Sequence, residues 1–178
     1  GLGLIASIVG LFAIRPSSVK DPQRALDVGF WVTAILSVAG MTFAALVMLE
    51  SWWFVLAGLV GILTSVAFVY ITQYYTSGTW RPVQEIAEAS KTGPATNIIA
   101  GLAIGFENTA IPIITISLAL GSSFWLGLQG VEDLGLAVPH LTAGVFGTAV
   151  ATMGMLMSAA YILAMDTFGP IADNAGGI

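Results

Sequence analysis

Long runs without a charged residue alternate with short polar segments along this chain. Four runs contain no Asp, Glu, Lys or Arg, and they cover residues 28–49, 51–80, 108–131 and 134–165. Each exceeds the length of about 20 apolar residues that a helix needs to cross a bilayer. Apolar residues occupy every face of these runs, a pattern typical of membrane helices and not of alternating strands. The pattern predicts an all-α, polytopic transmembrane helical bundle.

Five membrane spans fit this pattern, and we expect them at residues 1–14, 28–49, 52–75, 96–120 and 141–165. We treat residues 1–178 as a single transmembrane domain, with polar loops at 15–27 and 76–95. All Lys and Arg residues fall in these two loops, whereas Glu50, Glu132 and Asp133 fall on the other side. Because positively charged loops remain in the cytoplasm, both loops are predicted to be cytoplasmic.

Composition narrows the possible functions. Hydrophobic residues make up 57% of the chain and charged residues 8%, whereas soluble domains carry about 25% charged residues. The net charge is −5 and no basic block occurs, which excludes nucleic acid as the partner. The absence of Cys and the single His exclude disulfides and multi-His metal sites. Since the chain begins at Gly1 without Met, we expect an internal piece of a larger protein.

Two short segments carry clear signals of local structure. The loop between spans three and four is predicted to contain a helix over residues 81–91, because Pro82 suits a first turn and Glu88 precedes Lys91 by three residues. Gly93-Pro94 would end it. Spans two and three are joined by little more than Glu50-Ser51, which predicts a tight hairpin.

The strongest chemical signal lies at the end of the last apolar run. Asp166 and Asp173 are seven residues apart, which places them near one helix face and about 10 Å apart along the axis. They would line one funnel, in which Asp173 and Asn174 supply hard oxygen ligands for Mg²⁺ at the mouth and Asp166 lies deeper. Pro170 removes a backbone hydrogen bond between them. The alternative is an ordinary interfacial helix end with solvated acids.

Glu107 is a second candidate, near the middle of the predicted span 96–120. An ionised side chain is costly inside a membrane, so Glu107 must be paired, protonated or in contact with water. One hypothesis gives it a role in ion handling. The other is structural: Gly101 and Gly105 form a GxxxG pattern typical of close helix contacts, across which Glu107 would form a hydrogen bond.

Several motifs in this chain resemble those of the membrane-bound, ion-translocating pyrophosphatases. They are Tyr74-Tyr75-Thr76-Ser77, Arg81-Pro82-Val83, the segment 88–99 and the segment 166–178. The resemblance covers about the whole chain and corresponds to helices seven to eleven of a fold of about sixteen. It implies hydrolysis of cytoplasmic pyrophosphate, outward pumping of H⁺ or Na⁺, a requirement for Mg²⁺ and a homodimer in the lipid bilayer.

The same resemblance assigns roles to particular residues. Asp173 matches an acid that holds Mg²⁺-pyrophosphate, and Asp166 matches a deeper acid of the same helix, so both are catalytic candidates. With Asn174, Asp173 is a metal-ligand candidate. Asp166 and Glu107 are candidates for the ion pathway or coupling, although the helix with Glu107 resembles an outer one near the dimer contact, which favours a structural role. Gln73 stands where family members often have Glu.

The form Met165-Asp166-Thr167-Phe168-Gly169-Pro170 resembles the proton-pumping branch that does not require K⁺. We therefore expect an H⁺ pump of a bacterial inner membrane, with its active site on the cytoplasmic side and K⁺ not required. The chain on its own is expected to be inactive. The alternative function is a segment of a secondary ion-coupled transporter or channel that hydrolyses nothing.

Overall fold

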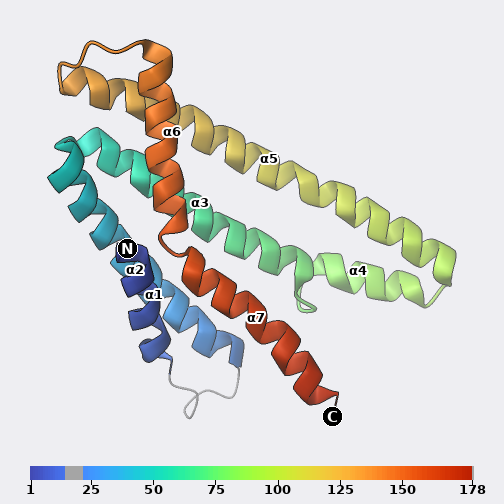
Figure 1. Cartoon of the computed structure of the whole chain (residues 1–178). Coiled ribbons are helices and arrows are strands. Elements are labelled where there is room, and N and C mark those ends of the chain that lie inside the picture. The colour runs from blue at the N-terminus through green and yellow to red at the C-terminus, as the bar shows by residue number, and fades with distance from the viewer. Residues whose placement is uncertain (15–21, 178) are drawn as a thin grey trace.

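The computed structural model describes residues 1–14 and 22–177, without the side chains of residues 22, 23, 172 and 173. The described residues form the helices α1 (Leu2–Ala13), α2 (Pro22–Leu49), α3 (Trp52–Thr76), α4 (Arg81–Ser90), α5 (Pro94–Asp133), α6 (His140–Leu156) and α7 (Ala159–Gly176) (Figure 1). No strand occurs among them. The predicted all-α class is confirmed.

Three stretches of the described chain are long and apolar enough to cross a membrane. They are Arg24–Leu49 in α2, Trp52–Ser90, which combines α3 and α4, and Pro94–Asp133 in α5. Helices α6 and α7 together meet the same test as a fourth stretch, bent by 46°. Helix α1 has 12 residues, and its length of about 18 Å falls short of the bilayer core. The protein is an integral membrane protein.

The helices differ in two places from the predicted segments. Helix α5 runs through 40 residues without a break, whereas the expected span covers only 96–120. The segment 141–165 is divided between α6 and α7. Residues 15–21 of the predicted loop 15–27 lie outside the described residues, and the levels at which the helices enter the membrane stay predictions.

The turn between α2 and α3 is as short as expected. Glu50 has a φ of 54°, a left-handed conformation that reverses the chain within two residues. The Ser51 hydroxyl accepts a hydrogen bond from the Trp53 backbone N–H at 3.4 Å and so caps α3. It also donates to the Asp133 carboxylate at 2.8 Å. The start of α3 is thereby tied to the end of α5.

The described Lys and Arg residues all lie toward one end of the bundle, together with acids such as Glu85 and Glu88 of α4. The start of α2, all of α4 and the end of α7 lie toward one end, and the α2–α3 and α5–α6 connections lie at the other (Figure 1). The first end therefore carries Arg24, Arg81 and Lys91, whereas the second carries acids only among its charged residues, Glu50, Glu132 and Asp133.

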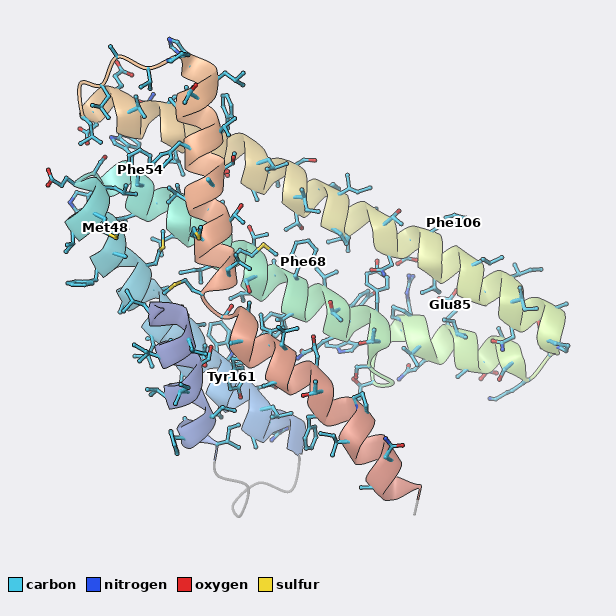
Figure 2. All side chains as sticks on the ribbon, viewed as in Figure 1. Met48, Phe54, Phe68, Glu85, Phe106 and Tyr161 are labelled. Carbon is cyan, nitrogen blue, oxygen red and sulfur yellow. The ribbon has the colours of Figure 1, made fainter. Side chains whose placement is uncertain are left out.

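Helix α6 packs between α3 and α5 through residues without bulky side chains. A methyl group added at Gly61 of α3 would collide with the backbone carbonyl of Ala151 in α6, and one at Gly147 of α6 would collide with the Ser123 carbonyl of α5. Such backbone contacts are typical of small residues at membrane helix interfaces. The main apolar core is formed by Met41, Phe54, Ala57, Ile62, Leu126, Val131, Ala143 and Val150. Figure 2 labels Phe54 of this core.

A second, smaller core fixes the start of α7. It consists of Phe30 of α2, Val69 of α3 and Tyr161 of α7. Tyr161 is 1% exposed, and its hydroxyl donates to the Leu26 carbonyl at 2.8 Å (Figure 2). A buried tyrosine hydroxyl needs such a partner. Helix α7 is thus anchored at its beginning to α2 and α3.

Candidate functional site

The candidate site begins where α6 ends and α7 starts. Ser158 lies at this break, is 3% exposed, and shares a hydrogen bond of 2.9 Å with Ser65 of α3. Its carbonyl accepts the Ile162 N–H at 3.0 Å, so the new helix begins directly at the break. The bend turns α7 away from the axis of α6 and leaves space between α7 and the second half of α3.

That space is an open groove of about 570 Å³. Apolar residues of α2, α3, α6 and α7 form most of its wall, among them Phe68 (Figure 2). Its polar lining residues are Ser65, Thr72, Gln73 and Thr76 of α3 and Asp166 of α7. The structure therefore brings Asp166 and Gln73, 93 residues apart in the sequence, to one groove.

Among the side chains that the structure describes, Asp166 is the one carboxylate that lines this groove. Pro170 lies four residues after it inside α7 and has no N–H, so the Asp166 backbone carbonyl lacks its usual helical donor. The side chain of Asp166 is exposed. A carboxylate, hydroxyls and an amide in a mostly apolar groove can bind a small cation or exchange a proton.

Asp173 and Asn174 occupy the last turns of α7. Asn174 is exposed, whereas the side chain of Asp173 lies outside the described residues. Asp173 follows Asp166 by seven residues, a rise of about 10 Å in a helix. Among the described residues no group of three or more His, Cys, Asp or Glu side chains could hold a metal ion. The donors described here do not build a Mg²⁺ site, and the proposed ligands stay a prediction.

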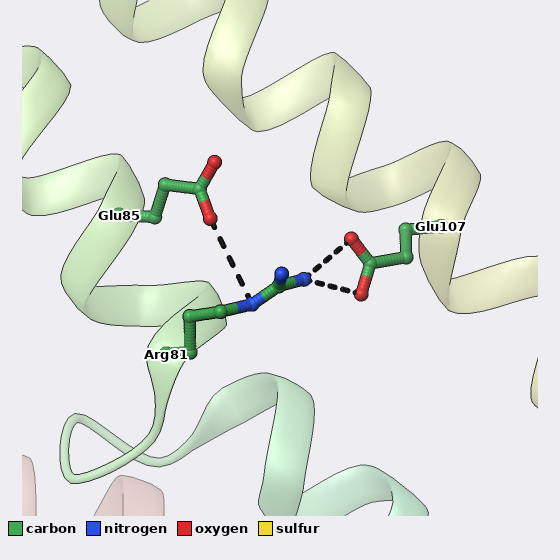
Figure 3. A network of polar contacts seen from close by, with 3 residues as sticks. All are labelled: Arg81, Glu85 and Glu107. Atoms are coloured by element: carbon green, nitrogen blue, oxygen red, sulfur yellow. Dashed lines mark hydrogen bonds and ion pairs between the residues drawn. The ribbon is translucent and has the colours of Figure 1, made fainter.

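Glu107 lies elsewhere, between α5 and α4, and it is paired (Figure 3). Nη2 of Arg81 donates to both of its carboxylate oxygens, at 2.6 and 2.7 Å. Arg81 also forms an ion pair of 3.8 Å with Glu85 one turn along α4. The buried ring of Tyr75, at the end of α3, lies near the same carboxylate. The Arg81 and Glu107 side chains are 58% and 43% exposed.

The partner of Glu107 is thus Arg81, which the sequence did not suggest. The structural hypothesis for Glu107 expected a close helix contact at Gly101 and Gly105. In the described part of the chain a methyl group at either position would meet nothing within 4 Å, so the described residues do not make this contact and it stays a prediction for the longer protein. The close contacts occur instead further along α5, at Gly127 and Gly130.

Comparison with known proteins identifies the family. The family model described as inorganic H⁺ pyrophosphatase matches residues 1–178. The chain belongs to this family. The resemblance seen in the motifs of the sequence is therefore confirmed, and the groove with Asp166 lies in a chain of this family.

Relatives of the family resemble the chain throughout. It is 54% identical to a K(+)-insensitive pyrophosphate-energized proton pump 2 of Moorella thermoacetica, with 99% of the chain and 25% of the relative covered. It is 47% identical to the pyrophosphate-energized membrane proton pump 3 of Arabidopsis thaliana, covering 98% and 23%. It is 38% identical to a putative K(+)-stimulated pyrophosphate-energized sodium pump of Bacteroides thetaiotaomicron, covering 99% and 24%. The chain spans about a quarter of the length of these relatives.

Proposed function

We propose that the protein to which this chain belongs hydrolyses pyrophosphate with Mg²⁺ and pumps H⁺ across the membrane. The observation that carries the proposal is the placement of Asp166 beside Gln73 and Thr72 in a mostly apolar groove between α3 and α7, in a chain that matches the family over its full length. An ionisable group in such a position is a candidate for the ion pathway.

The two acids of α7 divide the work in this proposal. Asp173 contacts the substrate and, with Asn174, provides two of the oxygen ligands for Mg²⁺. A cluster of Mg²⁺ ions around a diphosphate needs more hard oxygen ligands than these, so the others come from the rest of the longer protein. Asp166 lies about 10 Å from Asp173 along the helix. Its carboxylate couples the substrate site to the ion path through its electric charge and by binding and releasing a proton.

The names of the relatives support H⁺ as the pumped ion without a need for K⁺. The K(+)-insensitive proton pump is 54% identical to the chain and the putative K(+)-stimulated sodium pump is 38% identical. The expected result is that vesicles containing the longer protein acidify in the absence of K⁺ and take up no ²²Na⁺. Stimulation by K⁺ or uptake of Na⁺ would reverse this part of the proposal.

We place the active site on the cytoplasmic side of a bacterial inner membrane, because the described Lys and Arg residues gather at the end of the bundle where α7 finishes. Single cysteines replacing Ser90 in α4 and Ala137 in the α5–α6 connection test the orientation. Both residues are exposed. An impermeant thiol reagent added outside intact cells should label the second and spare the first, and the opposite result would invert the orientation.

The decisive experiment uses the longer protein in vesicles, with phosphate release and lumen acidification measured together. Asp173→Asn should remove an anionic ligand and nearly abolish hydrolysis. Asp166→Asn should lower H⁺ transport per phosphate released more than it lowers hydrolysis. Glu132→Gln, at the other end of the bundle, serves as the control and should leave both rates unchanged.

Each outcome decides a part of the proposal. Normal hydrolysis by the Asp173→Asn variant would show that Asp173 is not part of the substrate site. Equal losses of hydrolysis and transport in the Asp166→Asn variant would show that the two acids do not have separate roles. A wild-type protein that carries ions without releasing phosphate would favour the alternative, a secondary transporter or channel. The proposed homodimer is tested by the mass of the detergent-solubilised protein. The chain of 178 residues alone should release no phosphate, since it holds too few ligands.

A further inference from the structure

Two polar contacts mark two levels along the antiparallel pair α3 and α5. At one end, Ser51 donates to Asp133. At the other end, Arg81 donates to Glu107 (Figure 3). Between these levels neither segment, 52–80 or 108–131, contains an Asp, Glu, Lys or Arg. The 24 residues of the second segment span about 36 Å as a helix, which suits a hydrocarbon core of about 30 Å.

Helix α5 is longer than this core. Its 40 residues extend over about 60 Å, so one part must stand beyond the hydrocarbon. The charged residues of the neighbouring helix α4 indicate that this is the first part of α5. Helix α4, which packs beside the first half of α5, carries Arg81, Glu85 and Glu88, and Lys91 at its end pairs with Glu88 at 2.5 Å. Four charged groups within one short helix region are costly in hydrocarbon and stable in water.

We propose that Glu107 marks a membrane boundary on α5. Residues 108–131 cross the bilayer, and α4 with residues 94–107 of α5 forms a helical hairpin outside it, clamped at its base by the Arg81–Glu107 ion pair. Glu107 is then a positioning residue that holds α4 against α5, and it does not carry ions. This inference stands independently of the proposed function, because it concerns the placement of helices and not the reaction.

The pair has the features of a boundary clamp. Both side chains are about half exposed, and both oxygens of Glu107 are engaged by one guanidinium nitrogen. Aromatic rings lie at the same level: Tyr74 contacts Trp80 with ring centres 5.6 Å apart, beside Tyr75. Aromatic rings of this kind concentrate where hydrocarbon meets water.

The hairpin also has an apolar side that requires cover. Four exposed side chains lie on it, Ile98, Ile99, Leu102 and Phe106, and Figure 2 shows Phe106 on the outer side of α5. Outside the bilayer such a patch is covered by protein. Because the chain spans only about a quarter of its relatives, we assign this cover to further segments of the same longer polypeptide.

The placement is tested by electron cryomicroscopy of the longer protein in lipid nanodiscs. We expect the lipid belt to end within about one helical turn of Glu107, with protein density against Ile98 and Phe106. Lipid that surrounds Ile98 and Ile99 would overturn the boundary. A second copy of the protein against this face would overturn the assignment of its cover.

The clamp is tested by exchanging its charges. Arg81→Glu and Glu107→Arg should each lower the thermal stability of the purified protein, and the double variant should restore it. If Glu107 only positions α4, the double variant keeps H⁺ transport per phosphate released within about twofold of wild type. The matching exchange of Glu88 and Lys91 is the control, and should change little because that pair is more exposed.

Two results would overturn the clamp. Failure of the double exchange to restore stability would show that the pair does not hold the hairpin. Restored stability with lost transport would place the Glu107 carboxylate in the ion pathway. If the longer protein proves not to hydrolyse pyrophosphate, the stability results and the nanodisc map still decide the inference.

Discussion

Helices α6 and α7 are the two arms of one bent apolar segment, and they meet their surroundings in different ways. The buried residues of α6 are small or β-branched: Ala143, Gly144, Gly147, Val150, Ala151 and Gly154. Helix α7 buries Tyr161 near its start, and from Thr167 to Ile171 its side chains are exposed in this chain. Its two acids and Asn174 lie in this second arm.

The two arms of this segment differ in their residues: α6 packs closely against its neighbours, whereas α7 carries ionisable side chains. In lipid, close helix contact depends on small residues that let backbones approach, and such residues leave no side chain to bind an ion. Ionisable residues instead need a groove with polar neighbours, which the bend between the arms provides. We conclude that α6 holds α3 and α5 together, and under the proposed function α7 presents the reactive groups.

The largest expected effect comes from adding one methyl group to the supporting arm. Gly147→Ala would force α6 away from the Ser123 carbonyl and Gly127, and we expect a loss of about 3 kcal/mol in the free energy of unfolding. Gly169→Ala in α7 is the matched control, because in the described part of the chain nothing lies within 4 Å of its added methyl group. Its effect should stay within about 1 kcal/mol.

Unfolding of the longer protein in mixed micelles with increasing SDS measures both variants. Equal losses for Gly147→Ala and Gly169→Ala would break the contrast between the arms, because the packed arm would then tolerate volume no worse than the open one.

An intermediate effect is expected at the joint between the arms. Ser158→Ala removes the hydrogen bond to Ser65, and we expect a loss of about 1 kcal/mol, in the range of polar contacts between membrane helices. Ser65→Ala should cost about as much, and the double variant should cost no more than one single variant. Additive losses in this cycle, measured by the same unfolding experiment, would show that the two hydroxyls act separately.

The smallest effect on stability is expected at the acid of the open arm. Asp166→Asn changes a charge on an exposed side chain of the groove with little change of shape. The free energy of unfolding should stay within about 0.5 kcal/mol of wild type, while H⁺ transport falls. A large loss of stability would make Asp166 a structural residue and would remove the distinction between the arms.

Local signals in the sequence predicted local structure well. Pro82 and the Glu88–Lys91 spacing predicted the short helix that the structure has as α4, because first-turn prolines and i, i+3 pairs act within one helix. Glu50-Ser51 predicted the tight turn, since two long apolar runs flank it. Asp166 and Asp173 were predicted as site residues on a local signal too, because charged residues are rare at the end of a long apolar run.

Contacts between distant segments were harder to predict. Arg81 and Glu107 are 26 residues apart, and their pairing depends on the register of α4 against α5, which no single helix specifies. The break at Ser158 carries neither Pro nor Gly at its own position, so nothing in the pattern marked it. The GxxxG pattern at Gly101 and Gly105 matched the spacing of helix contacts, yet the described contacts lie at Gly127 and Gly147, because apolar neighbours alone do not tell which glycines face a helix.

The backbone contacts of α6 have a consequence for the entropy of assembly. Glycine and alanine have no side-chain rotamers to lose when a helix docks, whereas long side chains give up as much as about 2 kcal/mol each on burial at 25 °C. Gly61, Gly147 and Gly154 meet backbone atoms of the neighbouring helices. The contacts at these glycines therefore carry little side-chain entropy that separation of the helices would restore. They should weaken less on warming than contacts formed by leucine or methionine.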